Sequence, residues 1–121
     1  MFRRGEIYYV DFGENTATSV QSGIRPALIV SNNRANRYSP VITVVPLTTK
    51  TWKKRYQPTH VFLSGMAGFG LSRNSMVLAE QLLSVDKSRI GDKIGEITDV
   101  ETMARITKAV QIQIGVMEQY N

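Results

Sequence analysis

Residues 41–47 read Val-Ile-Thr-Val-Val-Pro-Leu, and this β-branched run is the strongest fold signal in the chain. An apolar run of this length, bounded by turn residues, is typical of a buried strand. Four similar stretches lie on either side of it, at residues 7–12, 26–30, 58–63 and 75–79. Residues 80–85 continue from the last of them. The sequence therefore predicts five or more short strands.

Only the C-terminal part of the sequence has a helical pattern. Thr98 and Glu101 fit a capping box, with Thr98 as the N-cap. Apolar residues then follow at steps of three or four: Val100, Met103, Ile106, Val110, Ile114 and Met117. We therefore expect one amphipathic helix of about twenty residues. Before it, residues 86–97 indicate a short helix or turn and then an edge strand.

The length of 121 residues favours a single domain that spans residues 1–121. Several short strands and one helix indicate the α+β class, here a small and strongly curved barrel with a C-terminal helix. The chain has no cysteine, which excludes disulfides, thiolate nucleophiles and cysteine zinc sites. No apolar run reaches the roughly 20 residues that a spanning helix needs, and the start is no secretory signal. We expect a cytoplasmic protein without a membrane partner.

Charge is distributed unevenly along the chain, which carries a formal net charge of +5. Residues 15–79 contain eight Lys or Arg residues and no acid, whereas residues 80–121 contain seven acids and five bases. A basic surface attracts polyanions such as nucleic acid. A solvated basic surface that keeps a small protein soluble remains the alternative.

Several kinds of chemistry lack their usual residues. There is one histidine and the acids are scattered, so we expect no metal cofactor. No phosphate-binding P-loop, GxGxxG or nucleophile-elbow pattern is present. A ribonuclease mechanism with two histidines is excluded.

The residues that remain as candidates stand at strand ends. Arg25 lies between residues 13–23, which we expect to form a mobile loop, and a strand whose Pro26 keeps Arg25 extended. An arginine fixed there is suited to bind a phosphate, although a surface ion pair is the simpler interpretation. The Thr48 hydroxyl follows the third strand and either donates to a phosphate or satisfies a local turn.

A second group of candidates is basic, aromatic or polar. Trp52 stands among lysines and arginines, a pattern that binds a nucleic-acid backbone and stacks a base unless the indole folds onto the core. His60 is best interpreted as a hydrogen-bonded structural histidine. Glu80 and Gln81 end the fifth strand. A carboxylate and an amide in that position either transfer a proton or bind base edges, and the simpler interpretation is an ordinary polar strand end.

Five motifs occur in order along the chain: RGEIY at 4–8, GIRPALIV at 23–30, VPLT at 45–48, PTHV at 58–61 and Glu80-Gln81. Together they resemble the MazF/PemK family of bacterial toxins, over essentially the whole chain. The resemblance implies an SH3-like β-barrel with a C-terminal helix, which pairs as a homodimer. It also implies an endoribonuclease that cuts single-stranded RNA without a cofactor, and an antitoxin with an acidic, disordered segment.

The same resemblance implies roles for individual residues. Arg25 and Thr48 match the family's catalytic arginine and threonine, which act while the ribose 2′-hydroxyl attacks the adjacent phosphate to leave 2′,3′-cyclic phosphate and 5′-hydroxyl ends. Leu78 replaces an arginine that the PemK branch uses, while Glu80 keeps a carboxylate as a candidate acid or base. The candidates for RNA binding are Thr49, Trp52, Lys53, Lys54, Arg55 and Gln81.

Two other functions fit such a barrel. One is a poison of DNA gyrase, as in the related CcdB group, and the other is an SH3-like module that binds RNA without cutting it. Arg25 followed by Pro26, together with Thr48, favours the nuclease. Fold alone does not decide among the three functions.

Overall fold

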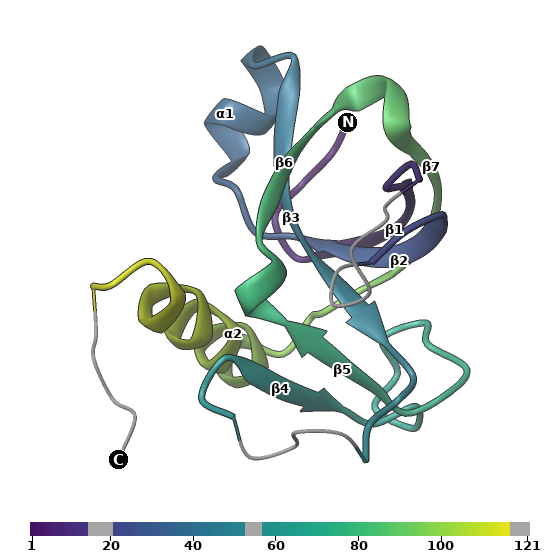
Figure 1. Cartoon of the computed structure of the whole chain (residues 1–121), viewed down its shortest axis with the longest axis vertical. Helices are drawn as coiled ribbons and strands as arrows, with labels where there is room; N and C mark the ends of the chain where they lie inside the picture. Colours follow the sequence, from purple (N-terminus) through teal and green to yellow (C-terminus); the bar gives the residue numbers. More distant parts are fainter. Residues whose placement is uncertain (15–20, 53–56, 117–121) are drawn as a thin grey trace.

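The structure, a computed structural model, describes residues 1–14, 21–52 and 57–116 (Figure 1). Within these ranges the chain forms one seven-stranded antiparallel sheet and two α-helices. The elements are β1 (Glu6–Asp11), β2 (Ile24–Ile29), α1 (Asn33–Tyr38), β3 (Val41–Thr48), β4 (His60–Leu63), β5 (Ser75–Leu78), the short 3-10 helix η1 (Ala79–Gln81), β6 (Leu83–Asp86), the 3-10 helix η2 (Lys87–Arg89), β7 (Ile90–Glu96) and α2 (Val100–Gln113). The five expected strands and the α+β class are confirmed. The fifth strand ends at Leu78, however, and η1 separates it from β6, so Glu80 and Gln81 lie in a helical turn and not at a strand end as we expected.

The long strand β3 joins the two halves of the sheet. Its first half pairs with β6, from Val41 opposite Asp86 to Val44 opposite Leu83, and its end pairs with β5, with Thr48 opposite Met76. Its other edge pairs with β2, where Ala27 lies opposite Pro46. The strand order is β4-β5-β3-β2-β1-β7, with β6 added on β3.

Among the strands that the structure describes, the sheet curls without closing into a ring of hydrogen bonds. In the described residues β7 pairs only with β1, and β6 pairs only with β3. The chain itself connects β6 to β7 through η2 and so completes the curl that Figure 1 shows around the N-terminal residues. The strand pairing thus gives an open, strongly curled sheet, and it does not by itself establish the small barrel that we expected.

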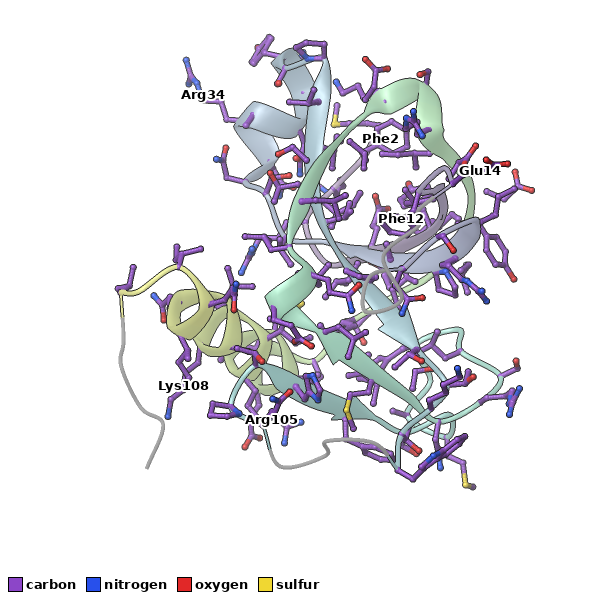
Figure 2. The ribbon with its side chains drawn as sticks, in the orientation of Figure 1. Phe2, Phe12, Glu14, Arg34, Arg105 and Lys108 are labelled. Atoms are coloured by element: carbon purple, nitrogen blue, oxygen red, sulfur yellow. The ribbon has the colours of Figure 1, made fainter. Side chains whose placement is uncertain are left out.

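Apolar side chains are buried on both faces of this sheet. One cluster, which includes Ile7, Leu28 and Val45, continues to Ile106 of α2. The other cluster lies within the curl and includes Tyr8, Ala27 and Val44, and Figure 2 shows Phe2 and Phe12 directed into it. Because successive residues of a strand face opposite sides, a strand covered on both faces needs an unbroken apolar run. This explains the near-continuous runs in β2 and β3.

The helix α2 differs from the expected one at its start, at its length and in its buried face. Asp99, not Thr98, is the N-cap, and its carboxylate accepts hydrogen bonds from the backbone of Glu101 and Thr102. The helix has 14 residues. Val100 and Ile114 of the expected stripe are 84% and 58% exposed, whereas Met117 lies outside the described residues. The buried face is formed by Thr102, Ile106, Ala109 and Ile112.

A second helix, α1, contradicts the expectation that only the C-terminal part is helical. It has six residues, and the side chain of its N-cap Asn32 accepts from the Ala35 backbone at 2.8 Å. Its buried residue is the polar Asn36, so no apolar periodicity marks it. The expectations for residues 86–97 are confirmed by η2 and β7.

The ends of the segment between β1 and β2 are fixed by backbone hydrogen bonds. Phe12 N donates to Gly23 O at 2.9 Å, and Gly23 N donates to Gly13 O at 2.8 Å. Both glycines have a φ of +72°, which a side chain disfavours. Residues 15–20 of the loop that we expected to be mobile lie outside the described part. The helices that the structure describes include none long and apolar enough to cross a membrane.

A buried carboxylate holds β7 against β1. Glu6 is 7% exposed and accepts from Lys93 Nζ at 2.8 Å, the Arg3 backbone at 2.7 Å and the Tyr8 hydroxyl at 3.1 Å. Burial raises the pKa of Glu6, but these three donors together outweigh it, so the pKa lies below its usual range. Folding therefore favours the ionised form.

We predict that Glu6→Gln destabilises the protein by about 1–3 kcal/mol at pH 7, because three donors lose the charged acceptor that they share at a buried position. Since the folded pKa is lowered, this stabilisation is present above the unfolded glutamate pKa of about 4.3 and is lost as the pH falls through the folded pKa. Urea unfolding of both proteins at pH 7 and at pH 4 measures this. An unchanged difference between them at the two pH values would contradict the role of the charge.

Candidate active site

Arg25 is held at the start of β2 with its side chain exposed. It pairs with Val10 across the sheet, and Pro26 follows it within the strand. Its Nε donates to the carbonyl of Ser22 at 3.1 Å, which fixes one edge of the guanidinium. None of the ion pairs in the described residues involves Arg25, so the surface ion pair considered above is not formed there. The remaining N–H groups suit an anion that arrives from solution.

Thr48 is the last residue of β3 and is half-buried. Its hydroxyl oxygen accepts from the Lys50 backbone at 3.2 Å. This hydrogen bond satisfies a local turn, which is one of the two roles that the sequence suggested for Thr48. Because the oxygen is the acceptor here, the hydroxyl hydrogen is left to act as a donor.

The structure brings Arg25 and Thr48 to one small cavity of about 180 Å³. It is lined by Gln21, Arg25, Pro26, Leu47, Thr48, Thr49, Lys50 and Ser75. Two cations and no acid are among these residues, so the cavity favours an anion. It is smaller than the 300–1,000 Å³ or so that is usual for a whole small ligand. A single group of a longer polymer, such as one phosphate, fits this volume better.

The basic segment after β3 is described only in part. Thr49 is exposed and lines the cavity. Trp52 is 72% exposed, so its indole does not fold onto the core and is open to stack on a base. Lys53, Lys54 and Arg55 lie outside the described residues, and their part in RNA binding stays a prediction.

Glu80 and Gln81 lie in η1 and have different surroundings. The Glu80 carboxylate contacts His60 Nε2 at 2.7 Å and accepts from the Thr59 hydroxyl at 3.1 Å, and Glu80 does not line the cavity. Gln81 Oε1 accepts from the backbone of Gln21 at 2.9 Å, which ties it to a lining residue. The His60 side chain is only 4% exposed, in agreement with a structural histidine.

Three polar lining residues, Gln21, Lys50 and Ser75, were not among the site candidates. Lys50 directly follows Thr48 and Thr49, so its position in the basic segment was a usable signal. Gln21 and Ser75 carried no such signal in the sequence, because only the pairing of β2, β3 and β5 brings them to the cavity. In the described residues no three His, Asp or Glu side chains gather where they could hold a metal ion.

A second and larger hollow of about 750 Å³ lies between β4 and α2. Its apolar lining includes Val61, Leu63, Phe69 and Ile112. Arg105 and Lys108 also line it, and Figure 2 shows both projecting from α2 on the side of β4. This hollow is formed by other residues than the cavity around Arg25.

Comparison with protein families identifies the class of protein. The model of the PemK-like, MazF-like toxin of type II toxin–antitoxin systems matches residues 3–114, which include every residue of the small cavity. The protein is thus of the toxin class of these two-component systems. The chain belongs to the PemK-like, MazF-like toxin family, as its motifs indicated.

Two curated relatives are similar over nearly their whole length. Endoribonuclease EndoA of Bacillus subtilis (strain 168) is 34% identical over 116 residues, which are 96% of this chain and 97% of that protein. Endoribonuclease MazF of Staphylococcus saprophyticus is 34% identical over 115 residues, or 95% and 92% of the two chains. The similarity therefore covers the fold and the cavity together.

Solved structures agree with this assignment. A mycobacterial endoribonuclease in complex with its cognate antitoxin has a TM-score of 0.77 at 30% identity, and the match covers 98% of this chain and 100% of that one. MazF of Deinococcus radiodurans has a TM-score of 0.74 at 24% identity, with 93% and 96% covered, which supports the fold alone.

We predict that Arg25→Ala leaves the free energy of unfolding within about 0.5 kcal/mol of the parent, because an exposed side chain with one hydrogen bond contributes little to stability. Thermal and urea unfolding of both proteins measure it. A loss of more than about 1.5 kcal/mol would show that Arg25 has a structural role instead.

Proposed function

We propose that this protein is a toxin that cuts single-stranded RNA, chiefly mRNA, as a metal-independent and sequence-specific endoribonuclease. The observation that supports this most is the meeting of Arg25 and Thr48 in one cavity with cationic and no acidic lining. The names of the two curated relatives, both endoribonucleases, agree with it.

The chemistry we propose needs no bound metal and no attacking water. The ribose 2′-oxygen forms a bond to the adjacent phosphorus and loses its proton, while the bond from phosphorus to the 5′-oxygen breaks and that oxygen gains a proton. The products are a 2′,3′-cyclic phosphate and a 5′-hydroxyl. Arg25 stabilises the charge that develops on the phosphorane, and Thr48 donates to a non-bridging oxygen. Oriented donors of this kind contribute about 3 kcal/mol each to the transition state.

RNA binding in this proposal extends from the cavity along the basic segment. The exposed Trp52 stacks on an unpaired base, while Thr49 and Gln81 contact the backbone or base edges. Lys53, Lys54 and Arg55 add phosphate contacts. The absence of acids from residues 15–79 supports this surface as the one that RNA meets first.

The proposed partner that stops this activity is an antitoxin with an acidic, disordered segment. The cavity that attracts phosphate also attracts carboxylates, so such a segment competes with RNA for Arg25 and Lys50. The toxin then acts in the cytoplasm, where mRNA is available. We further propose that the curled sheet is an SH3-like barrel that the chain completes between β6 and β7.

We also propose that two copies pair through the hollow between β4 and α2. β4 is an edge strand of the described sheet, and an edge strand is suited to pair with another copy. The apolar lining of Val61, Leu63 and Phe69 gives the contact a hydrophobic centre. A homodimer with a two-fold axis would bury the same surface of each copy.

We predict that the purified protein cuts a mixed-sequence single-stranded RNA in excess EDTA, and that Arg25→Ala and Thr48→Val each lower the rate about 10²- to 10³-fold. The reason is that each change removes a donor from the developing charge. End mapping measures the cyclic phosphate, the 5′-hydroxyl and the recognised sequence.

The control is the unfolding measurement on Arg25→Ala described above, which separates lost chemistry from lost fold. Cutting that survives Arg25→Ala would remove Arg25 from the catalytic role. A protein that binds the RNA pool without cutting it would favour the RNA-binding module, and DNA breakage without RNA loss would favour the gyrase poison.

We predict that Ala67→Arg weakens self-association at least tenfold, because Ala67 lines the hollow and a buried charge there is costly. The matched control is Met66→Arg, since Met66 is 96% exposed and does not line the hollow. Sedimentation equilibrium of the parent and both variants measures it. A monomeric parent, or equal effects of the two changes, would contradict pairing through this surface.

A further inference from the structure

The side chain of Glu80 is held at both of its oxygens. Oε1 accepts from the hydroxyl of Thr59 at 3.1 Å, and Oε2 lies 2.7 Å from Nε2 of His60. His60 is the first residue of β4 and Thr59 directly precedes it. Thr59 is 4% exposed, and the His60 side chain is equally buried. A carboxylate between two buried partners has a defined position.

This contact fixes η1 to β4 together with the backbone. Ala79 N donates to Thr59 O at 2.9 Å, so the residue before Glu80 is bound to the same place. Leu82 N then donates to Ala79 O at 3.2 Å and closes the short helical turn. The turn is thus anchored at its first residue by the backbone and at its second by a side chain.

The next residue of the turn reaches the small cavity. Gln81 Oε1 accepts from the backbone N–H of Gln21, and Gln21 lines the cavity beside Arg25. The contacts therefore run from His60 and Thr59 through Glu80 to Gln81 and on to Gln21. Gln21 stands two residues before Gly23, at the entry to β2.

We propose that Glu80 is a positioning residue: with His60 and Thr59 it orients η1, so that Gln81 holds Gln21 at the wall of the cavity around Arg25. This inference rests on the proposed endoribonuclease function for its consequence in catalysis, but its structural part is independent of that function. It gives the PTHV motif at residues 58–61 a role that RNA contact does not require.

The alternative role of Glu80 is that of a proton acceptor in the reaction. Two observations speak for positioning instead. Both carboxylate oxygens already have partners, and Glu80 is not among the residues that line the cavity with Arg25 and Thr48. A general base has to come within hydrogen-bond distance of the proton that it removes.

Glu80→Gln and Glu80→Ala separate the two roles. The Gln amide keeps the shape of the carboxylate. Its oxygen accepts from Thr59, and its nitrogen donates to Nε2 of His60 in the tautomer that carries the ring proton on Nδ1, but the amide is no base. For positioning we expect Glu80→Gln to stay within about threefold of the parent, and Glu80→Ala to lose about 10- to 100-fold in kcat with a smaller change in KM. For a base, both variants would lose about 10²- to 10⁴-fold.

The matched control is Glu101→Gln, which makes the same change at an exposed glutamate of α2. A large loss in Glu80→Gln with the fold intact would overturn the proposal in favour of the base. Full activity in Glu80→Ala would overturn it as well, because neither the charge nor the anchor would then matter.

A second measurement does not depend on activity. Amide hydrogen exchange at Gln21 reports the hydrogen bond to Gln81, and we expect its protection to fall at least tenfold in Glu80→Ala and to persist in Glu80→Gln. Unchanged protection in Glu80→Ala would overturn the proposal. If the parent does not cut RNA at all, the proposed function fails, while loss of Gln21 protection in Glu80→Ala alone would still support the positioning role.

Discussion

The long strand β3 is the constraint on which the rest of the molecule depends. It pairs with β6 over its first half, with β5 at its end and with β2 along its other edge, so it belongs to both halves of the sheet. Pro46 is accommodated within it opposite Ala27, although a proline removes one backbone donor from the ladder. Because β2 and β3 are neighbours in fixed register, the start of β2 and the end of β3 lie together. Arg25 and Thr48 meet for this reason. A register shift of one residue between β2 and β3 would place the two side chains on opposite faces of the sheet.

Burial on both faces of the sheet explains how much of the fold the sequence predicts. β2 and β3 lie between the two apolar clusters, so their runs are continuous and easily recognised. The short helix α1 depends on a cap by Asn32 and a buried amide, Asn36, and neither leaves an apolar period. The face of α2 was misplaced for a related reason, because small or polar residues such as Thr102 and Ala109 pack inward while Val100 is exposed. Hydropathy alone would predict that Val100 is buried and that Thr102 is exposed.

The residues of the candidate site also differ in how far the sequence alone could predict them. Arg25 and Thr48 were predictable because short motifs at strand ends carry them, and strand ends are positions that the sheet fixes. Gln21 and Ser75 were not predictable, because they join the cavity through tertiary pairing. Glu80 was recognised as a charged residue in a suggestive place, but its partners Thr59 and His60 are set by the pairing of β4 with β5. Residue type predicts what a side chain is able to do, whereas packing decides which of its atoms are already engaged.

The charge of the cavity bears directly on the chemistry. In the proposed reaction, the two lining cations Arg25 and Lys50 would stabilise negative charge on phosphorus-bound oxygens, and they would lower the energy of the phosphorane more than that of the bound substrate. The same cations disfavour a protonated base beside them, and the Arg25 guanidinium is a hydrogen-bond donor with no acceptor atom, so it is a poor base. Stabilisation of charge is therefore the part of the proposed catalysis for which this cavity is best suited. Wall residues that keep these donors in place, such as Gln21, would then contribute by positioning, since an oriented dipole is effective only where it need not reorganise during the reaction.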